Sequence, residues 1–415
     1  MEPQQKRILY VVHRFWPHPG GSERLFYHFA RRSVSEGHRV TVFTTDAWDP
    51  ESYHKPWKKR LPAGFEKYNG IDILRFHVAN IPLQYKFLGA LSLLPIDSIR
   101  LLFGYPFVLL PGYLREVFIR RPHFDLVIAG VLPHTHLIYP AAWLAHHSGV
   151  PWVGVPLIHT GVVGDKPVRG HLSREQVRLM KQADAIITAT DAGNCALIAQ
   201  GIDSHKLHKV GVGVDPLELA GGQGKRFRDR FHIDGPIILH VSTMTASKGT
   251  IDLVEAMKKL WAIGNPARLV LIGQLTDKFE DYFLSQPPSV FERTLLLGFV
   301  DDETKKDALD ACDIFALPSS ADSFGVVFLE AWLYGKPVIG AEAGGIPYVI
   351  ADDRDGLLVQ FGDVAGLAAR IADLLSDPDR RHSLGEAGRQ KVLAHHTWDK
   401  VCHRMSEVTN PILYH

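Results

Sequence analysis

The chain has little cysteine, with only Cys195, Cys312 and Cys402 among its 415 residues. These three positions are far apart, so they form neither a C-x-x-C motif nor the framework of a disulfide-rich domain. So few cysteines are typical of a protein that works in a reducing compartment. We therefore expect a cytoplasmic location.

Long apolar runs are also missing. No stretch of 18 uncharged apolar residues occurs, so we expect no membrane-spanning helix. The amino-terminal sequence MEPQQKRILYVVHRFW lacks an apolar core of signal-peptide length. A transmembrane receptor, channel or transporter is therefore not expected.

Neither sign of charge is in excess. Forty-six Lys and Arg face forty-five Asp and Glu, for a net charge of +1, and nothing in this balance suggests a nucleic-acid partner. Apolar residues make up 46% and charged residues 22%, as in ordinary globular proteins. A chain of this length rarely folds around one core, so two domains of roughly 200 residues are expected.

The most informative stretch runs from Ala316 to Gly345. A short apolar run leads into the polar loop SSADSFG, an apolar segment follows, and Gly335 and Pro337 end it before the next apolar run. This order of strand, loop, helix and strand predicts a βαβ unit, with backbone N–H groups at the helix start that favour an anion. Asp322 and Glu330 lie eight residues apart within it, and a carboxylate in an apolar stripe is costly without a partner.

This stretch resembles the donor site of the retaining glycosyltransferases of family 4, whose pattern is Glu, seven residues, Glu. Here Asp322 replaces the first Glu, a departure of one methylene. The resemblance implies an α/β fold of the GT-B type: two doubly wound, Rossmann-like domains that face a cleft, with a C-terminal helix crossing back to the first. It places an acceptor-binding domain at 1–215 with helix 396–415, and a nucleotide-sugar-binding domain at 216–395.

The start of the second domain carries a related signal. The run Ile237–Val241 predicts a strand, and Lys248 and Gly249 precede an amphipathic helix. In the family this segment supplies an Arg and a Lys that clamp the donor diphosphate; Lys248 matches, but Thr243 stands at the Arg position. Three arginines elsewhere are candidates to supply the missing cation: Arg14, Arg226 and Arg228.

A glycine-rich segment nearby, GGQGKR, invites comparison with a P-loop. That motif needs Gly at position 219 and Ser or Thr at 226, where Leu219 and Arg226 stand. The segment is therefore interpreted as a flexible turn.

In the first domain, Arg7–His13 predicts a buried strand and Ser22–Gly37 a helix, with Ser22 as its N-cap. Gly20 and Gly21 lie between them, where backbone can approach a phosphate. The alternative is a plain tight turn. In the family the equivalent glycine pair borders the donor diphosphate and the acceptor.

Family members also carry a histidine near the reacting sugar, just after a strand that corresponds here to Asp125–Gly130. Because this strand ends in Gly130, the nearest histidines are His134 and His136, and we favour His134 as the substrate-contacting residue. A structural or exposed loop histidine is the alternative. His159 and Thr160, after the next strand, are further candidates.

Two parts of the first domain are unusual. His54–Arg60 (HKPWKKR) surrounds a tryptophan with four cations, which indicates either a solvated loop or contact with an anionic membrane or a charged acceptor. Ile81–Tyr113 is apolar and poor in charge, which indicates either buried helices or shallow insertion into a membrane.

The resemblance assigns roles in transfer from a nucleotide sugar, whose leaving group is a diphosphate. Glu330 would accept hydrogen bonds from ribose hydroxyls, Asp322 would hold donor-sugar hydroxyls, and the Lys248 ammonium would stabilise the leaving charge. The catalytic set is Asp322, Glu330, Lys248 and His134. The donor-binding set is Gly20, Gly21, Thr243, Phe299, Val300, Ser323, Phe324, Gly325, Val326 and Val327.

The implied function is a retaining hexosyltransferase that moves sugar from a UDP-sugar or GDP-sugar to a glycan or lipid-linked acceptor, in cell-surface polysaccharide or glycolipid biosynthesis. The resemblance implies no metal and no other cofactor. A metal-dependent transferase would need a functional Asp-x-Asp, and the two candidates, 353–355 and 377–379, lie in polar, turn-like stretches. A non-catalytic GT-B binding protein is the alternative; a Rossmann oxidoreductase is disfavoured because no G-x-G-x-x-G follows the first strand.

Overall fold

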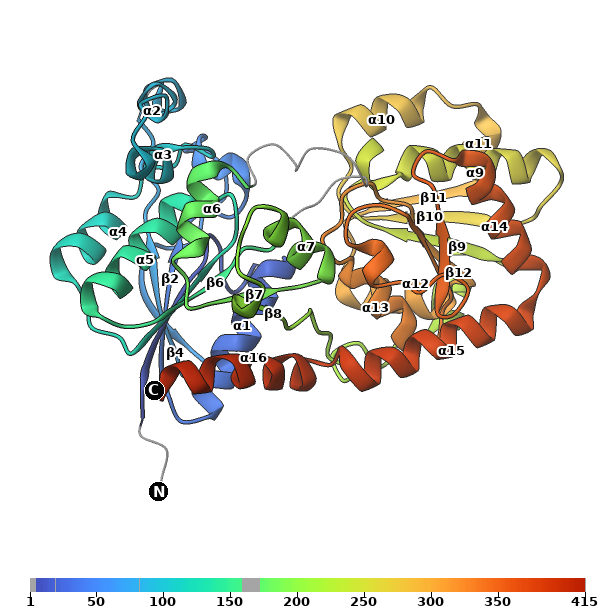
Figure 1. Ribbon diagram of the computed structural model, residues 1–415. Coiled ribbons are helices and arrows are strands. Elements are labelled where there is room, and N and C mark those ends of the chain that lie inside the picture. The colour runs from blue at the N-terminus through green and yellow to red at the C-terminus, as the bar shows by residue number, and fades with distance from the viewer. Residues whose placement is uncertain (1–4, 19, 82, 159–171, 415) are drawn as a thin grey trace. The chain divides into compact units, whose positions relative to one another are not determined.

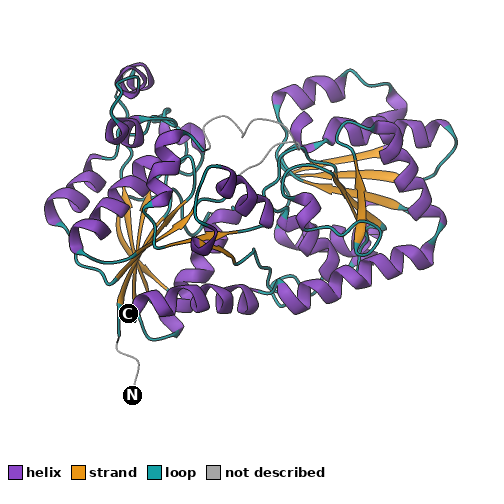
Figure 2. Ribbon diagram, viewed as in Figure 1, coloured by secondary structure: helices purple, strands orange, loops and turns teal. Residues whose placement is uncertain are grey.

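The computed structural model describes residues 5–414 except 19, 82 and 159–171. These residues form two compact units. Unit 1 contains residues 5–158, 172–211 and 401–414, and unit 2 contains residues 212–400. In each unit a central sheet is covered by helices (Figure 2). The sequence prediction divides the chain after Asp215, and the compact units divide after Gly211.

Unit 1 is built on an eight-stranded sheet in the order β3-β4-β2-β1-β5-β6-β7-β8. All neighbours are parallel except the antiparallel pair β3–β4. The strands are β1 (Arg7–Val11), β2 (Arg39–Thr45), β3 (Gly64–Tyr68), β4 (Ile71–Phe76), β5 (Leu126–Gly130), β6 (Trp152–Val155), β7 (Ala185–Thr188) and β8 (Leu207–Lys209). The chain builds outward from β1 on one side, then returns to β5 and builds the other side. The topological switch point therefore lies between β1 and β5.

Helices cover both faces of this sheet (Figure 1). They are α1 (Gly21–Ser35), α2 (Gln84–Ser92), α3 (Asp97–Phe103), α4 (Pro111–Arg115), α5 (Thr135–Ser148), α6 (Arg174–Lys181) and α7 (Asp191–Ala199). Short single turns are η1 (Pro50–Tyr53), the π-turn η2 (Glu116–Arg120) and η3 (Ser204–Lys206). The predicted N-cap at Ser22 is wrong: Gly20 caps α1, and the Ser22 hydroxyl donates instead to Glu23.

The last helix, α16 (Trp398–Leu413), begins in unit 2 and ends in unit 1. Its unit 1 part is fixed by polar contacts. The Ser406 hydroxyl donates to Glu36 Oε1 at 2.8 Å, and Arg404 Nε donates to the carbonyl of Val210 at 2.9 Å. The crossing helix expected from the resemblance is therefore present.

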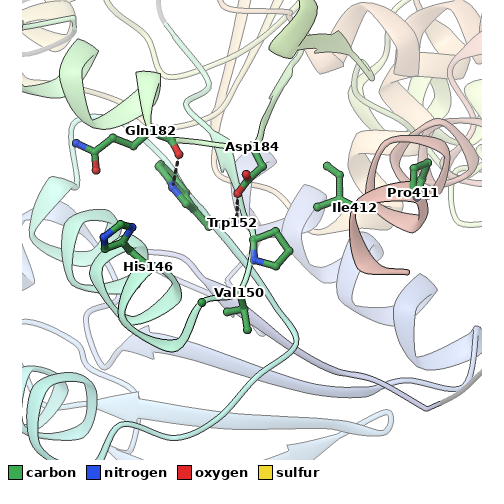
Figure 3. Close-up of a pocket in the computed structure, with 9 residues that line it drawn as sticks. His146, Val150, Trp152, Gln182, Asp184, Pro411 and Ile412 are labelled. Atoms are coloured by element: carbon green, nitrogen blue, oxygen red, sulfur yellow. Dashed lines mark hydrogen bonds between the residues drawn. The ribbon is translucent and has the colours of Figure 1, made fainter. Parts of the chain in front are cut away.

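The amino ends of the strands of unit 1 border a hollow of about 630 Å³ (Figure 3). Trp152 begins β6, and its backbone N–H donates to Asp184 Oδ2 at 2.9 Å, while Pro411 and Ile412 of α16 contribute to the lining. This hollow lies at the strand edge opposite the switch-point loops, because those loops follow the carboxyl ends of β1 and β5.

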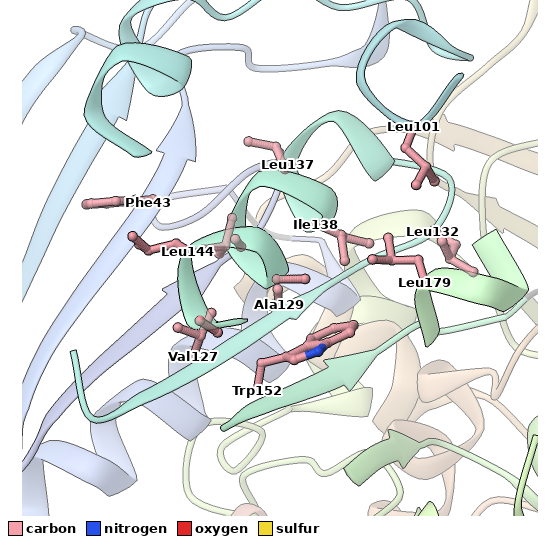
Figure 4. Close-up of a cluster of buried hydrophobic side chains, with 14 of the residues drawn as sticks. Phe43, Leu101, Val127, Ala129, Leu132, Leu137, Ile138, Leu144, Trp152 and Leu179 are labelled. Atoms are coloured by element: carbon pink, nitrogen blue, oxygen red, sulfur yellow. The ribbon is translucent and has the colours of Figure 1, made fainter. Parts of the chain in front are cut away.

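The core of unit 1 fixes α5 against the sheet. Leu137, Ile138 and Leu144 of α5 pack toward Val127 and Ala129 of β5 (Figure 4). All five side chains are fully or almost fully buried. Because α5 is held along its length, the residue that caps its amino end is held as well.

Unit 2 is built on a six-stranded parallel sheet in the order β11-β10-β9-β12-β13-β14. The strands are β9 (Ile237–Val241), β10 (Arg268–Ile272), β11 (Thr294–Gly298), β12 (Ile314–Leu317), β13 (Val338–Ala341) and β14 (Gly356–Val359). Here the chain reverses direction across the sheet between β9 and β12. The strand predicted to reach Val300 ends at Gly298, so Phe299 and Val300 belong to the following loop.

Its helices are α8 (Gly224–Phe231), α9 (Thr250–Ala262), α10 (Asp277–Leu284), α11 (Pro288–Arg293), α12 (Asp302–Ala311), α13 (Val326–Leu333), α14 (Val364–Ser376) and α15 (Pro378–His395). The single turns are η4 (Ala246–Lys248) and η5 (Ile346–Tyr348). Leu253 and Met257 of α9 and Ile371 of α14 are buried in one apolar core with the sheet. Two α/β units, each with its own core, agree with the predicted fold class.

Candidate functional site

The switch point of unit 2 brings two loops together. Ile314 and Phe315 of β12 pair with Ile238 and Leu239 of β9, so both strands end at the same edge of the sheet. In open α/β sheets, ligands bind beyond the carboxyl ends of the strands at this position. The loops that leave it, residues 242–249 and 318–325, contain four of the ten predicted donor-binding residues, together with Lys248 and Asp322.

These two loops are tied to each other. The Ser320 N–H donates to the carbonyl of Ser247 at 2.8 Å, and the Ser319 hydroxyl donates to the same carbonyl at 3.3 Å. Gly249 has a φ of +68°, and a Cβ there would come within 2.2 Å of the carbonyl oxygen of Pro318. Only glycine permits this backbone and this approach, so Gly249 sets the spacing of the loops.

The second loop leads into the amino end of α13. The Gly345 N–H donates to the carbonyl of Asp322 at 2.7 Å, and Gly325, with a φ of +79°, starts the helix. The first N–H groups of a helix have no intrahelical acceptor and carry partial positive charge. In the described part of the chain, no hydrogen-bond acceptor is found for the N–H groups of Ser323, Phe324, Gly325, Val326 and Val327. Such N–H groups at the start of a helix favour a bound anion.

Lys248 and Asp322 form an ion pair between the two loops. Lys248 Nζ lies 2.7 Å from Asp322 Oδ1, and both side chains are partly buried. Asp322 Oδ2 is buried and has no hydrogen-bond partner in the described residues. An ammonium carries three donors and a carboxylate about four acceptor positions, so both groups can still bind a ligand. The sequence placed both residues in one site without predicting that they pair.

Glu330 of α13 is buried, with an exposed fraction of 5%, and its partner is Lys305 of α12. Lys305 Nζ donates to Oε1 at 2.9 Å and lies 2.8 Å from Oε2. The second contact lacks hydrogen-bond geometry, so we treat it as an ion pair that leaves Oε2 able to accept a hydroxyl. Sequence reasoning expected a partner for this carboxylate and missed Lys305, because nothing in the run DETKK indicates which lysine points inward.

His240 of β9 is a second residue that sequence reasoning missed. Its ring is fully buried; Nδ1 lies 2.9 Å from the carbonyl of Ala316, and Nε2 lies 2.7 Å from Ser242 Oγ and 3.0 Å from Thr250 Oγ1. Burial lowers the pKa of His240 to about 4, so the ring is neutral, with Nδ1 donating and Nε2 accepting. It ties β9 to β12 and α9 beneath the two loops. A histidine inside the apolar run IILHV was the signal in the sequence.

The remaining donor-site candidates lie around this switch point. Thr243 is exposed in the loop after β9, and Phe299 is 80% exposed in the loop after β11, followed by the half-buried Val300. The Phe324 ring, by contrast, is buried and packs edge-on against His396 at 5.4 Å between ring centroids. Phe324 therefore offers its backbone N–H to the site, and its ring stabilises the loop.

The arginines considered as the missing cation all have carboxylate partners. Arg226 lies 2.5 Å from Asp307 and 2.6 Å from Glu303. Arg228 lies 2.9 Å from Asp313. The third, Arg14, pairs with Glu23 in unit 1. These ion pairs engage the three guanidinium groups within the protein, so none of the three arginines is assigned to the donor site.

The switch point of unit 1 gathers histidines. His13 follows β1 and His134 caps α5, and their rings stack 4.0 Å apart with planes 6° from parallel. His136 is buried beside them, with Tyr53 nearby. Burial lowers the pKa of His13 to about 4 and that of His136 to about 3. The predicted His134 thus stacks on a buried, neutral His13 in an aromatic cluster.

Glu23 organises the loop that contains Gly20 and Gly21. Its buried carboxylate lies 2.8 Å from Arg14 Nε and 3.4 Å from His13 Nε2. Burial raises the pKa of Glu23, but the neighbouring His13, Arg14 and His18 and the Ser22 hydroxyl outweigh it and lower the pKa overall. A Cβ on Gly20 would come within 2.2 Å of Glu23 Oε2, so this carboxylate explains the glycine.

The aspartate triplets are structural. Asp355 is buried and accepts from the Ala351 N–H and from Lys391 Nζ, and Asp377 caps α15. Across the described residues, no group of three His, Cys, Asp or Glu side chains is placed to hold a metal ion.

The basic loop His54–Arg60 has partners for its cations. Arg60 lies 2.9 Å from Asp46, Lys55 and Lys58 contact Glu51 at 3.0 and 2.7 Å, and Lys59 lies over the Trp48 ring. The loop is therefore less free to bind an anionic surface than its sequence suggests. Among the described helices, none has the length and apolarity to span a bilayer. The candidates His159 and Thr160 lie outside the described residues.

Comparisons with known proteins show the family of the chain. Residues 224–391 match the family model described as "Glycosyl transferases group 1", and residues 20–213 match a "Glycosyl transferase 4-like domain". A D-inositol 3-phosphate glycosyltransferase of Xylanimonas cellulosilytica is 30% identical over 302 residues, covering 66% of this chain and 70% of that protein. A GDP-mannose-dependent monoacylated alpha-(1-6)-phosphatidylinositol monomannoside mannosyltransferase of Corynebacterium glutamicum is 31% identical over 180 residues, covering 42% and 46%.

Solved structures show the same fold. Anabaena Alr3699/HepE, in complex with UDP and glucose, superposes with a TM-score of 0.71 at 19% identity, covering 98% of this chain and all of that one. WaaG, a glycosyltransferase involved in lipopolysaccharide biosynthesis, superposes with a TM-score of 0.67 at 16% identity, covering 97% and 99%.

Proposed function

Because the chain belongs to the group 1 glycosyl transferases and has the GT-B fold, we propose that this glycosyltransferase moves a hexosyl group with retention of anomeric configuration. The donor in this proposal is a UDP-sugar or GDP-sugar, and the acceptor is a glycan or a lipid-linked precursor. The non-catalytic alternative is set aside, because the family and its curated relatives are glycosyltransferases.

One observation carries the proposal: the Lys248–Asp322 pair lies beside the unpaired N–H groups at the start of α13, at the switch point of unit 2. A departing nucleoside diphosphate develops negative charge, which preorganised N–H groups and an ammonium stabilise. Asp322 Oδ2, buried without a partner, would accept hydroxyls of the donor sugar. Glu330 would accept the ribose hydroxyls, and Phe299 and Val300 would contact the base.

The proposed order of bond changes is the one that the family resemblance implies. As the bond between the sugar C1 and the diphosphate oxygen breaks, the acceptor hydroxyl oxygen bonds to C1 from the same face. The hydroxyl proton passes to the departing phosphate oxygen, which gives a product of unchanged anomeric configuration. His134 would contact the reacting sugar. The scheme needs neither a metal nor another cofactor, so EDTA should leave the rate unchanged.

The choice of partners rests on the relatives' names. One relative is named for GDP-mannose and a phosphatidylinositol monomannoside, one structure holds UDP and glucose, and one protein serves lipopolysaccharide biosynthesis. These names support UDP or GDP as the nucleotide and a lipid-linked or glycan acceptor in a cell-surface pathway. A cytoplasmic protein in peripheral contact with an anionic membrane would meet such an acceptor.

The test is a donor screen with stereochemical readout. Purified protein is incubated with UDP- and GDP-sugars, and release and transfer of the sugar are followed by proton NMR. The proposal expects turnover of one donor class, and an α-linked product from an α-linked donor. An inverted product would contradict retention, and turnover only with added divalent metal would contradict the metal-free scheme.

A further inference from the structure

Helix α2 exposes large apolar side chains next to its buried side. Leu88 and Gln84 are buried against unit 1, and the Gln84 amide donates to the carbonyl of Phe107 at 2.9 Å. On the adjacent side, Phe87 is 64% exposed, and Leu83, the residue before the helix, is similarly exposed. Large apolar side chains exposed together are normally covered by a partner or by lipid. The interpretation of this segment as buried helices is therefore wrong for the outer side of α2.

The exposed apolar surface continues beyond α2. Leu93, in the turn before α3, is 78% exposed, and further exposed large apolar side chains of the segment are Ile81, Leu94, Ile96 and Tyr105. We call these side chains, with Leu83 and Phe87, the α2–α3 patch. Figure 1 shows α2 farther from the sheet of unit 1 than α3, which packs against α5 and α6. Large apolar side chains exposed together on one segment that projects from its unit mark an interaction surface.

The charge around the α2–α3 patch is positive. Between Ile81 and Ile96 there is no acidic residue, and the one cation, Lys86, is exposed beside Phe87. The next acid along the chain, Asp97, lies 2.5 Å from Arg178. A protein partner would normally meet a rim of mixed polar groups. A surface of leucine and phenylalanine with a lone lysine suits an anionic lipid surface better.

A neighbouring loop adds the aromatic residues that favour a bilayer interface. The backbone of Pro106, next to the exposed Tyr105, lies close enough to His54 to influence its pKa, so the loop His54–Arg60 lies near the α2–α3 patch. Trp57 of that loop is 76% exposed. Tryptophan and tyrosine are enriched at the headgroup level of membranes, where an apolar ring with a polar tip is stable.

We propose that the α2–α3 patch inserts shallowly into the headgroup region of an anionic bilayer and docks unit 1 on the membrane. The nine residues of α2 are about 14 Å long, far short of a bilayer, so contact is interfacial. Apolar side chains supply the attachment, and Lys86 supplies a preference for anionic lipid. The biological purpose, access to a lipid-linked acceptor, rests on the proposed function.

The test is co-sedimentation of the full chain with vesicles of phosphatidylcholine alone or mixed with phosphatidylglycerol. The wild type should bind the mixed vesicles. The double variant Phe87→Glu with Leu93→Glu should bind at least about tenfold more weakly, since charged side chains oppose entry into the interface. Lys86→Gln should weaken binding to anionic vesicles about fivefold, near the 1 kcal/mol given for one basic residue.

The matched control is Ile119→Glu, which changes a side chain of the same unit that is 73% exposed but lies on η2, away from the α2–α3 segment. It should bind vesicles like the wild type. Because all substituted residues are exposed, thermal unfolding should be unchanged, which separates lost binding from lost fold.

Three outcomes would overturn the proposal: no vesicle binding by the wild type, equal loss in Ile119→Glu, or a self-associated wild type that only the double variant makes monomeric. The last would identify a second copy of the chain as the occupant. Nucleotide binding, measured on the same samples, reports on the proposed function separately, because the patch belongs to unit 1 and the donor loops to unit 2.

Discussion

At the residue scale, the candidate site is a set of charges with assigned partners, of which Glu330 is buried and the others are partly buried. Asp322 and Lys248 neutralise each other, as do Glu330 and Lys305, so the donor loops hold no unpaired carboxylate. Removing one member of a buried ion pair leaves the charge of the other uncompensated, which destabilises the folded protein. The intact pair can still offer its remaining hydrogen-bond donors and acceptors to a ligand. The shorter Asp322 reaches Lys248 at 2.7 Å, so this departure from the family pattern leaves a complete ion pair.

Glu330→Gln tests the ribose contact. The amide keeps the shape of the side chain but offers a weaker acceptor, and a hydrogen bond to a charged group contributes roughly 1.5–3 kcal/mol. We expect nucleotide affinity to fall by about ten- to a hundredfold, measured by isothermal titration. Lys305→Gln is the comparison: it disrupts the same ion pair but keeps the carboxylate, so it should retain more affinity. Wild-type affinity in Glu330→Gln would refute the role.

At the scale of elements, the candidate site depends on loops that approach one another without side chains between them. Gly249 lies against Pro318, and a Cβ on Gly345 would come within 2.1 Å of the carbonyl oxygen of Ser323. Below these loops, His240 of β9 makes hydrogen bonds with the carbonyl of Ala316 in β12 and with Ser242 at the start of the first loop. The spacing of the N–H groups and of Lys248 therefore comes from backbone contacts.

Gly249→Ala should disturb this spacing. Gly264, at the end of α9, is the matched control, because its φ of +82° resembles the +68° of Gly249 but a Cβ there meets no atom within 4 Å. Both variants carry the backbone penalty of alanine at positive φ, of order 1 kcal/mol. Only Gly249→Ala should also weaken nucleotide binding, by roughly tenfold or more in a titration. Equal nucleotide affinities of the two variants would show that the contact with Pro318 does not affect nucleotide binding.

Local sequence patterns predicted the elements of both units where apolar periodicity and glycine stops are strong, as from Ile314 to Ala341. They missed β3, whose residues Gly64–Tyr68 are almost all exposed at the sheet edge and so carry no apolar alternation. They also misplaced the α1 cap, because Ser22 is drawn to the buried Glu23. The basic loop looked free in sequence because Asp46, which binds Arg60, comes from another element. Such long-range pairings follow from the fold and leave no mark on local composition.

At the scale of the whole molecule, three buried neutral histidines predict how stability depends on pH. His13 and His240 have pKa values lowered to about 4, and His136 to about 3, from an ordinary 6.5. Between these pKa values, the unfolded chain therefore binds protons that the folded chain does not bind.

Above pH 6.5 these histidines are neutral in both the folded and the unfolded chain, so they do not lower the free energy of unfolding. Between pH 6.5 and 4 they are protonated in the unfolded chain only, and the free energy of unfolding falls. At 1.36 kcal/mol per pKa unit, each should remove about 3 kcal/mol from the free energy of unfolding by pH 4. Urea denaturation from pH 8 to 4 measures this. His240→Phe should flatten the slope, and an unchanged slope would argue against a buried neutral ring.

The central claim is that the loops at the β9–β12 switch point bind the diphosphate of a nucleoside diphosphate through Lys248. Isothermal titration of the wild type and of Lys248→Gln with UDP, GDP and ADP tests this most directly. We expect one nucleotide to bind the wild type and to bind Lys248→Gln at least about tenfold more weakly, the loss expected for one charge-assisted contact. Binding of that nucleotide with equal affinity to both proteins, or no binding to the wild type, would contradict the account.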